Sequence, residues 1–171
     1  MMQRSSLFAY VLPFLLGAPL SVAVQPVSAQ SASGFSPTEV VRSALVAMEK
    51  GDLDTLNRIF APDGPWHLPG GETRLQGGPS KSLAEACPMC AHLSKRSIQI
   101  EVLVAQGEYV AVRSRWSGDY SGEPHGVSIQ NKPVVLTYQN IYRVRNGKIV
   151  ENWADYNGMD LLRQLGFTIA H

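Results

Sequence analysis

This chain of 171 residues has few cysteines, few histidines and almost no net charge. It contains two cysteines, four histidines and 15 basic against 14 acidic residues. Two cysteines cannot form a four-thiolate zinc site within one chain, and no basic stripe suited to nucleic acid is present. His67 and His125 lie far apart without an adjacent pattern of carboxylate ligands, so we predict neither a metal site nor another cofactor.

Long apolar runs are also missing. The N-terminal stretch from Leu7 to Leu16 is interrupted by Pro13 and falls short of the roughly 20 residues that a membrane-spanning helix needs. Together with Arg4 and the small-residue ending Val27-Ser28-Ala29, this stretch is typical of a secretory signal peptide at residues 1–29. A membrane anchor is the alternative interpretation.

We therefore expect cleavage after Ala29, a linker at residues 30–35 and one folded domain at residues 36–171. Cleavage removes Arg4, which leaves 14 basic and 14 acidic residues and a net charge of zero. We expect the mature protein to be secreted or periplasmic, with no stable membrane span and no nucleic-acid partner.

Local signals at the start of the domain predict helices. Ser36-Pro37-Thr38-Glu39 has the form of a capping box, and Gly51 is placed to end the helix that follows. Asp52 is placed to cap a second helix from Leu53 to Phe60. A strand around Trp66 and a third helical segment are expected next. The apolar residues of the first helix fall on one stripe, Val40, Val41, Ala44, Leu45 and Met48.

The second half of the chain has the alternating pattern of strands. Asn146-Gly147 is a strong signal for a two-residue hairpin turn. Residues 121–133 are rich in Gly and Pro and are expected to form a loop. The predicted elements are strands around Ile98–Val104, at Tyr109–Tyr120, Val134–Val144 and Ile149–Tyr156, and a terminal helix at Asn157–Leu165. This order predicts an α+β domain in which a curved antiparallel sheet wraps around the N-terminal helices.

Four stretches carry a resemblance to a known family: "GDLDTLNRIFAPD", "WHLPGG", "YVAVRSRWSGDYSGE" and, above all, "IYRVRNGKIVENWADYNGMDLLRQLG". They resemble the SnoaL-like branch of the nuclear transport factor 2-like superfamily, over roughly residues 36–167. The resemblance implies a cone-shaped, cystatin-like α+β barrel whose concave sheet closes over an apolar pocket. Characterised relatives include polyketide cyclases, epoxide hydrolases and ketosteroid isomerases.

A two-residue turn at Asn146-Gly147 also predicts which side chains share a face of the sheet. The expected cross-strand pairs are Val144 with Ile149, Tyr142 with Glu151, Asn140 with Trp153 and Tyr138 with Asp155. This face becomes polar and aromatic away from the turn, which is the composition of a ligand pocket. We predict that Trp153, Tyr138, Tyr142 and Trp116 contact the ligand, and that His125 lies in a loop at the pocket mouth.

Asp155 is the main catalytic candidate. In the SnoaL-like cyclases an Asp on the last strand acts as general acid/base, and the resemblance implies that role for Asp155. Enclosure by aromatic surface would raise the pKa of its carboxyl toward a useful range. Its alternative role is to cap the terminal helix. Asn140 and His67 are the other catalytic candidates. Alternatively, Asn140 only satisfies the hydrogen bonding of a buried strand neighbour, and His67 is only a surface residue.

Cys87 and Cys90 leave three interpretations open. Their spacing resembles a thioredoxin-like redox motif, but the alternating strand and helix order of that fold is missing. A shared zinc site would need a second chain. In an exported protein we favour a local disulfide at the start of a short helix.

Two functions follow from these patterns. The first is an exported enzyme that performs cofactor-independent acid/base chemistry, such as cyclisation, isomerisation or hydration, on a small hydrophobic molecule. The second is a module that binds such a molecule, or a protein, and catalyses nothing. We also expect a homodimer, because an open sheet presents a face that must be covered.

Overall fold

The computed structural model describes residues 34–75 and 78–168 of the chain. Its helices are α1 (Pro37–Lys50), α2 (Leu53–Ile59), α3 (Leu83–Ala86), α4 (Pro88–His92) and α5 (Gly158–Leu165). Its strands are β1 (Pro65–His67), β2 (Thr73–Leu75), β3 (Leu93–Gln106), β4 (Tyr109–Gly122), β5 (Ile129–Arg145) and β6 (Lys148–Tyr156), with a 3-10 helix, η1 (Pro124–Gly126), between β4 and β5. The predicted signal peptide lies outside the described residues. None of the described helices is long and apolar enough to cross a membrane.

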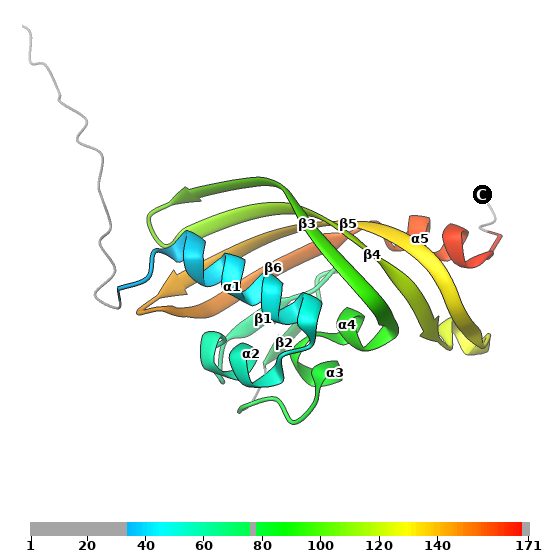
Figure 1. Cartoon of the computed structure of the whole chain (residues 1–171), viewed down its shortest axis with the longest axis horizontal. Helices are drawn as coiled ribbons and strands as arrows, with labels where there is room; N and C mark the ends of the chain where they lie inside the picture. The colour runs from blue at the N-terminus through cyan, green and yellow to red at the C-terminus, as the bar shows by residue number, and fades with distance from the viewer. Residues whose placement is uncertain (1–33, 76–77, 169–171) are drawn as a thin grey trace, which may run out of the picture.

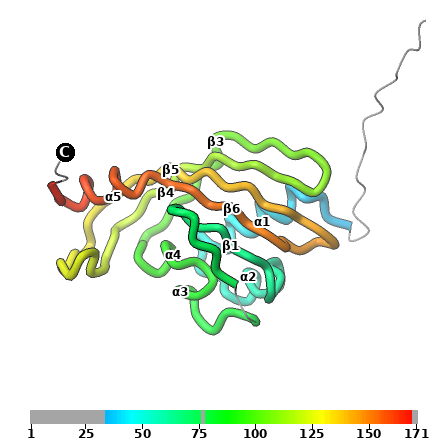
Figure 2. The backbone as a smooth tube through the Cα atoms, turned by 180° about the vertical axis from the view of Figure 1, so that it is seen from behind, coloured from blue at the N-terminus to red at the C-terminus, as the bar shows by residue number. Residues whose placement is uncertain are grey.

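The six described strands form one curved, open sheet in the order β2-β1-β6-β5-β4-β3. Neighbouring strands are antiparallel except β1 and β6, which run parallel side by side (Figure 2). Helices α1 to α4 gather on the inner side of the curved sheet, and α5 follows the end of β6 (Figure 1). The predicted α+β fold class is confirmed, with one parallel pairing that the sequence did not indicate.

Helix α1 begins and ends where the sequence predicts. Ser36 Oγ accepts a hydrogen bond from the Glu39 backbone N–H at 3.3 Å, and Glu39 Oε2 accepts one from the Ser36 N–H at 2.7 Å. Gly51 ends the helix with a φ of 71°, in the left-handed region. The predicted apolar stripe is buried against strands β3 to β6, so α1 forms the base of the core.

Strands β4 and β5 extend well into the segment that was predicted to be a loop. That prediction is wrong for residues 121–122 and 129–133, which lie in β4 and β5. Pro133 is tolerated in β5 because β6 pairs with β5 only from Tyr138 onward, so no ladder bond needs its missing N–H. Further along this open edge, the Gln164 amide of α5 both donates to and accepts from the Val135 backbone at 2.8 Å. The Gln164 side chain thus makes the two hydrogen bonds that a neighbouring strand would make with Val135, and these bonds hold α5 against β5.

A bulge in β6 overturns the predicted register of the final hairpin. Val144 pairs with Ile149 as expected, but Arg143 pairs with Glu151, so Val150 is an extra residue. Beyond this point every β6 side chain points to the face opposite to the predicted one. The remaining pairs are Tyr142 with Asn152, Ile141 with Trp153, Asn140 with Ala154, Gln139 with Asp155 and Tyr138 with Tyr156.

A second irregularity has the same effect in β3. Ile98 and Ile100 lie opposite Trp116 and Ser114, and then the register shifts so that Val102 lies opposite Arg113. The side chains of Val102 and Val104 consequently lie on the outer face, with 51% and 60% of their surface exposed. Strand β2, a three-residue edge strand, was not predicted at all.

Candidate functional site

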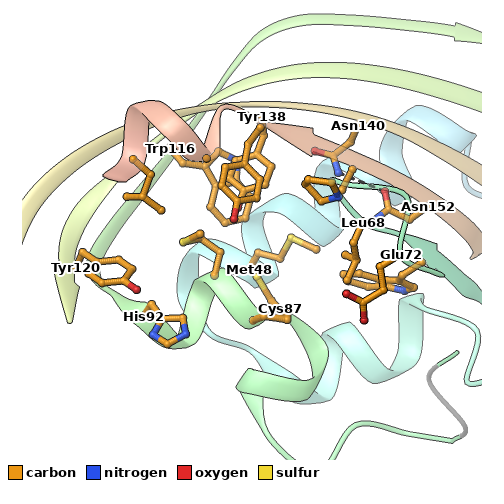
Figure 3. Close-up of a pocket in the computed structure, with 18 of the residues that line it drawn as sticks. Met48, Leu68, Glu72, Cys87, His92, Trp116, Tyr120, Tyr138, Asn140 and Asn152 are labelled. Carbon is orange, nitrogen blue, oxygen red and sulfur yellow. Dashed lines mark hydrogen bonds between the residues drawn. The ribbon is translucent and has the colours of Figure 1, made fainter. Parts of the chain in front are cut away.

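A cavity of about 550 Å³ lies between the inner face of the sheet and helices α1, α4 and α5. This size falls within the roughly 300–1,000 Å³ that is usual for small-molecule sites. Figure 3 shows His92 and Tyr120 at one end of it and Asn140 and Asn152 at the other, with Trp116 and other side chains between them. The cavity is therefore elongated, with polar groups at both ends and apolar walls in the middle.

Aromatic rings form the long wall of the cavity. The ring of Tyr138 lies 4.8 Å from that of Trp116 and 4.9 Å from that of Tyr156, both in tilted contact. Trp116 Nε1 donates to Ser114 Oγ at 3.0 Å, which satisfies the indole N–H inside the core. The indole therefore offers the cavity an apolar surface. Met48, Met89 and Leu161 complete the apolar lining from the helices.

Two facing amides form the polar end of the cavity. Asn140 and Asn152 are 7% and 1% exposed, and both line the cavity. Asn140 Nδ2 donates to Asn152 Oδ1 at 3.3 Å. Among the described residues, Asn152 Nδ2 and Asn140 Oδ1 have no other side-chain partner, so the pair retains one donor and one acceptor. The bulge in β6 creates this pair, because it turns Asn152 inward.

Two buried phenol groups contribute further donors. Tyr138 and Tyr142 line the cavity and are 8% and 1% exposed. Burial raises the pKa of both hydroxyls well above the ordinary value, and the neighbouring Tyr156 adds to the effect at Tyr138. Both therefore remain neutral O–H groups, able to donate a hydrogen bond, across the physiological pH range.

His92 is the functional candidate that the sequence did not indicate. It ends α4, lines the cavity and stacks on Tyr120 with ring centroids 5.5 Å apart. Its Nδ1 lies 3.1 Å from the Ser121 carbonyl oxygen, which can only accept, so Nδ1 carries the proton in this contact. Nε2 is then an unprotonated nitrogen in the neutral ring, without a partner among the described residues. The sequence signal that could have found it is its place four residues after the expected helix start at Pro88.

The structure divides the predicted site residues between two faces of the sheet. Trp116, Tyr138, Tyr142 and Asn140 line the cavity, and their roles in ligand binding and catalysis stay predictions. Trp153, Asp155 and His67 lie on the outer face, where the rings of His67 and Trp153 stack 5.0 Å apart. His125 contacts Phe167 edge-on at 5.9 Å and is not among the residues that line the cavity.

Asp155 occupies neither of the two positions expected for it. It is exposed on the outer face, and the bulge at Val150 is the physical reason. The cap of α5 is Asn157, whose Oδ1 accepts from the Asp160 backbone N–H at 3.0 Å. The role of Asp155 as acid/base stays a prediction, and its position favours other residues for the chemistry of the cavity.

The predicted disulfide is present. Cys87 and Cys90 are bonded, with their Cα atoms 5.2 Å apart, and α4 starts at Pro88 between them. Both are buried, and Cys87 lines the cavity. The bond therefore stiffens the segment that presents Met89 and His92 to the cavity.

Comparison with known proteins agrees with this geometry. Residues 38–165 match the family model described as SnoaL-like polyketide cyclase. No curated protein matches the chain. Among solved structures, IdmH of Streptomyces antibioticus, proposed to be a polyketide cyclase, is 31% identical with a TM-score of 0.65, covering 78% of this chain and 100% of its own.

Two more distant structures share the fold. A SnoaL-like polyketide cyclase of Agrobacterium tumefaciens is 16% identical with a TM-score of 0.58, covering 77% of this chain and 99% of its own. An epoxide hydrolase of Mycobacterium tuberculosis is 16% identical with a TM-score of 0.58, covering 75% and 88%. Since the family model spans most of the chain and IdmH is similar over its full length, the chain belongs to the SnoaL-like polyketide cyclase family.

Proposed function

We propose that the protein is a cofactor-independent, cyclase-type enzyme that acts on an elongated, largely apolar carbonyl compound. The observation that carries the proposal is the buried Asn140–Asn152 pair at the end of an aromatic cavity. Aromatic walls select for flat apolar rings, and a side-by-side donor and acceptor suit a carbonyl next to a hydroxyl. The amide pair thus anchors the far end of the substrate.

His92 is the proposed general base at the other end. Its Nε2 would take a proton from the carbon next to a substrate carbonyl, leaving an enolate. The enolate carbon then attacks a second carbonyl of the same molecule, which forms the new carbon–carbon bond. The resulting alkoxide takes the proton back from His92, so the reaction is balanced without a cofactor.

Tyr138 lies between the two ends of the cavity (Figure 3). Its hydroxyl is a neutral donor in a buried setting, where a hydrogen bond to a developing oxyanion is stronger than in water. The apolar surroundings also keep the reacting carbon away from water. We therefore assign stabilisation of the enolate to Tyr138.

Binding without catalysis is the second candidate function. It is favoured by the character of the charged groups at the cavity: Glu72 and His92 are both exposed, and no buried carboxylate lines the cavity among the described residues. In that case the amide pair and aromatic walls would hold the ligand, and His92 would act only as a wall residue.

Ligand capture tests what the two candidates share. We expect the purified domain to retain an aromatic carbonyl compound from a mixed pool of hydrophobic metabolites, and Asn152→Leu to weaken retention about tenfold through loss of the amide pair. Gln139→Leu, on the opposite face of β5, is the matched control and should bind normally. Retention is scored by mass spectrometry of the bound fraction, and conversion of the retained compound identifies an enzyme. Failure to retain any compound would reject both candidates.

We also propose that the outer face of the sheet pairs two copies of the chain. An outer patch of apolar side chains supports this, namely the exposed Val102, Val104, Tyr109 and Ile141 and the half-buried Trp153. Ion pairs of Arg113 with Glu101 and of Arg143 with Glu108 flank the patch and would form a polar rim.

Lysine at the centre of the outer patch should separate the dimer. We expect Val104→Lys combined with Ile141→Lys to sediment as a monomer at micromolar concentration, because two buried ammonium groups would lack partners. Val46→Lys, at an exposed apolar position of α1, is the matched control and should remain dimeric. A monomeric wild-type protein would overturn the proposal.

Export remains a proposal that rests on residues 1–29. The Cys87–Cys90 bond supports it, since disulfides persist in oxidising compartments. When the full chain is produced in a bacterium, the exported protein should begin at Gln30, and removal of residues 2–29 should retain it in the cytoplasm. N-terminal sequencing and fractionation check this, and full-length protein in the cytoplasm alone would contradict it.

A further inference from the structure

We propose that Thr73, His67 and Glu151 form a second reactive site, on the outer face of the sheet, that hydrolyses small esters through an acyl-threonine. The three residues come from neighbouring strands β2, β1 and β6. Thr73 Oγ1 lies 3.1 Å from His67 Nδ1, and His67 Nε2 lies 3.0 Å from Glu151 Oε1. None of them lines the cavity between the sheet and the helices.

The hydrogen-bond chemistry orients all three groups. An ionised Glu151 carboxylate can only accept, so His67 Nε2 carries the proton. In the neutral ring Nδ1 is then the acceptor, and the Thr73 hydroxyl must be the donor. Arg143 Nη1 lies 3.6 Å from Oε2 of Glu151, so this carboxylate also has an ion-pair partner. A hydroxyl, its base and an orienting carboxylate are thus in series, as nucleophile activation requires.

Strand pairing explains why this contact is close and accessible. The Leu68 N–H donates to the Glu72 carbonyl at 2.7 Å, so Leu68 and Glu72 are a hydrogen-bonded pair where β1 ends and β2 begins. Hydrogen-bonded and non-hydrogen-bonded pairs alternate along antiparallel strands, so the next pair, His67 and Thr73, exchanges no backbone hydrogen bonds. Side chains of such a pair approach closely, and their backbone groups point away from each other. Since β2 is an edge strand, the Thr73 N–H points out of the sheet, where it can donate to an oxyanion formed at Thr73.

An apolar surface beside the three residues suits a short acyl chain. His67 stacks on Trp153, and both line a second cavity of about 550 Å³ on the outer face together with Leu68 and Gly70. The far side of this cavity is formed by Val102, Val104 and Ile141 of the outer patch that is proposed to pair two copies. We therefore assign the acyl chain to the Leu68 and Gly70 side, next to the edge strand β2. His67 is about one-third exposed and Thr73 is exposed, so an ester can reach the hydroxyl from solvent. These features point to small, uncharged esters rather than to charged acyl donors.

The reaction balances without a further reactant. Thr73 Oγ1 attacks the ester carbonyl carbon while its proton moves to His67 Nδ1, and the alcohol leaves with that proton. A water molecule then gives its proton to His67 and attacks the acyl-threonine. The carboxylic acid leaves as Thr73 recovers its proton, so one ester and one water yield one acid and one alcohol.

The test is hydrolysis of p-nitrophenyl acetate by the purified protein, with intact mass spectrometry of samples quenched during turnover. We expect an acetylated protein, with the acetyl group on Thr73. Thr73→Val and His67→Gln should each lower the rate about 10²- to 10⁴-fold, and Glu151→Gln should lower it less. Thr73→Ser should remain active, which shows that a loss in Thr73→Val is not due to misfolding.

Thr137→Val is the matched control, because it removes another threonine hydroxyl from the outer face of the same sheet. Its rate should equal that of the wild-type protein. Hydrolysis that survives Thr73→Val would be catalysis by exposed imidazole alone and would overturn the proposal. Absence of hydrolysis above the buffer rate would overturn it as well. Neither result bears on the cavity between the sheet and the helices, so the two sites are tested separately.

Discussion

Replacing His92 with glutamine is expected to lower turnover of the cavity's substrate by about 10²- to 10⁴-fold, the usual contribution of a general base. Glutamine can still donate to the Ser121 carbonyl, which holds His92 Nδ1 at 3.1 Å, so the wall of the cavity should survive. Substrate affinity should change little, because the amide pair and the aromatic wall remain. Steady-state kinetics measures the fall in kcat, and ligand retention measures whether binding is preserved.

Two control variants make this result specific. His125→Gln removes an imidazole outside the residues that line the cavity, and its turnover should match the wild type. Asp155→Asn removes a carboxylate from the outer face and should also leave turnover unchanged. A collapse of turnover in Asp155→Asn with normal turnover in His92→Gln would reverse the assignment. It would mean that Asp155 reaches the reacting atoms after all.

Helix α1 and its ends were predictable because their causes are local. A cap, an apolar stripe and a left-handed Gly51 depend on residues within a few positions of one another. The family resemblance likewise extended over most of the chain, which is why the fold class was predicted correctly. The same local signals predicted the disulfide and the helix that starts at Pro88.

The site was only partly predictable because strand parity is a long-range property. Asn146-Gly147 sets the first pair of the hairpin, but nothing in the local sequence marks Val150 as the extra residue. That single insertion exchanges Trp153 and Asp155 for Asn152 and Ala154 on the inner face. A prediction made from alternation alone therefore places the wrong β6 residues on the inner face, although it places the β5 residues Tyr138 and Asn140 on the face where the structure has them.

Both register shifts move apolar side chains to the outer face of the sheet. In β3 the shift turns Val102 and Val104 outward, and in β6 it turns Trp153 outward. The outer face, which already carries Tyr109 and Ile141, thereby gains three further apolar side chains at its centre. The β6 shift also brings the Asn152 amide to the inner face, so the outward position of Trp153 and the polar end of the cavity share a physical origin.

Arg96 is expected to have the largest effect on stability. Its Nε lies 3.1 Å from the carbonyl oxygens of Met48 and Glu49, and its Nη1 donates to those of Cys90 and Leu93 at 2.8 and 2.6 Å. The guanidinium group thus joins the last turn of α1 to the end of α4 and the start of β3. It also places a positive charge at the C-terminal end of α1, where the helix dipole favours one.

Gly51 allows this arrangement. A Cβ atom at position 51 would lie 2.9 Å from Arg96 Nη2, and the φ of 71° already disfavours a side chain there. Because the guanidinium group packs directly against the backbone at Gly51, the end of α1 and Arg96 stabilise each other. Loss of Arg96 should therefore also destabilise α4, which carries Cys90 and His92.

Arg96→Met is expected to lower the free energy of unfolding by about 3 kcal/mol, because several partly buried carbonyl groups lose a charged donor and are only partly solvated by water. For a domain of this size the melting temperature should fall by roughly 10 °C. Arg96→Lys should recover only part of the loss, since one ammonium group cannot reach two pairs of carbonyls at once. Arg115→Met, a substitution of an exposed arginine on β4, is the control and should be nearly neutral. Thermal and urea unfolding measure these differences, and an Arg96→Met protein as stable as the control would show that the four carbonyl contacts do not hold α1 and α4 together.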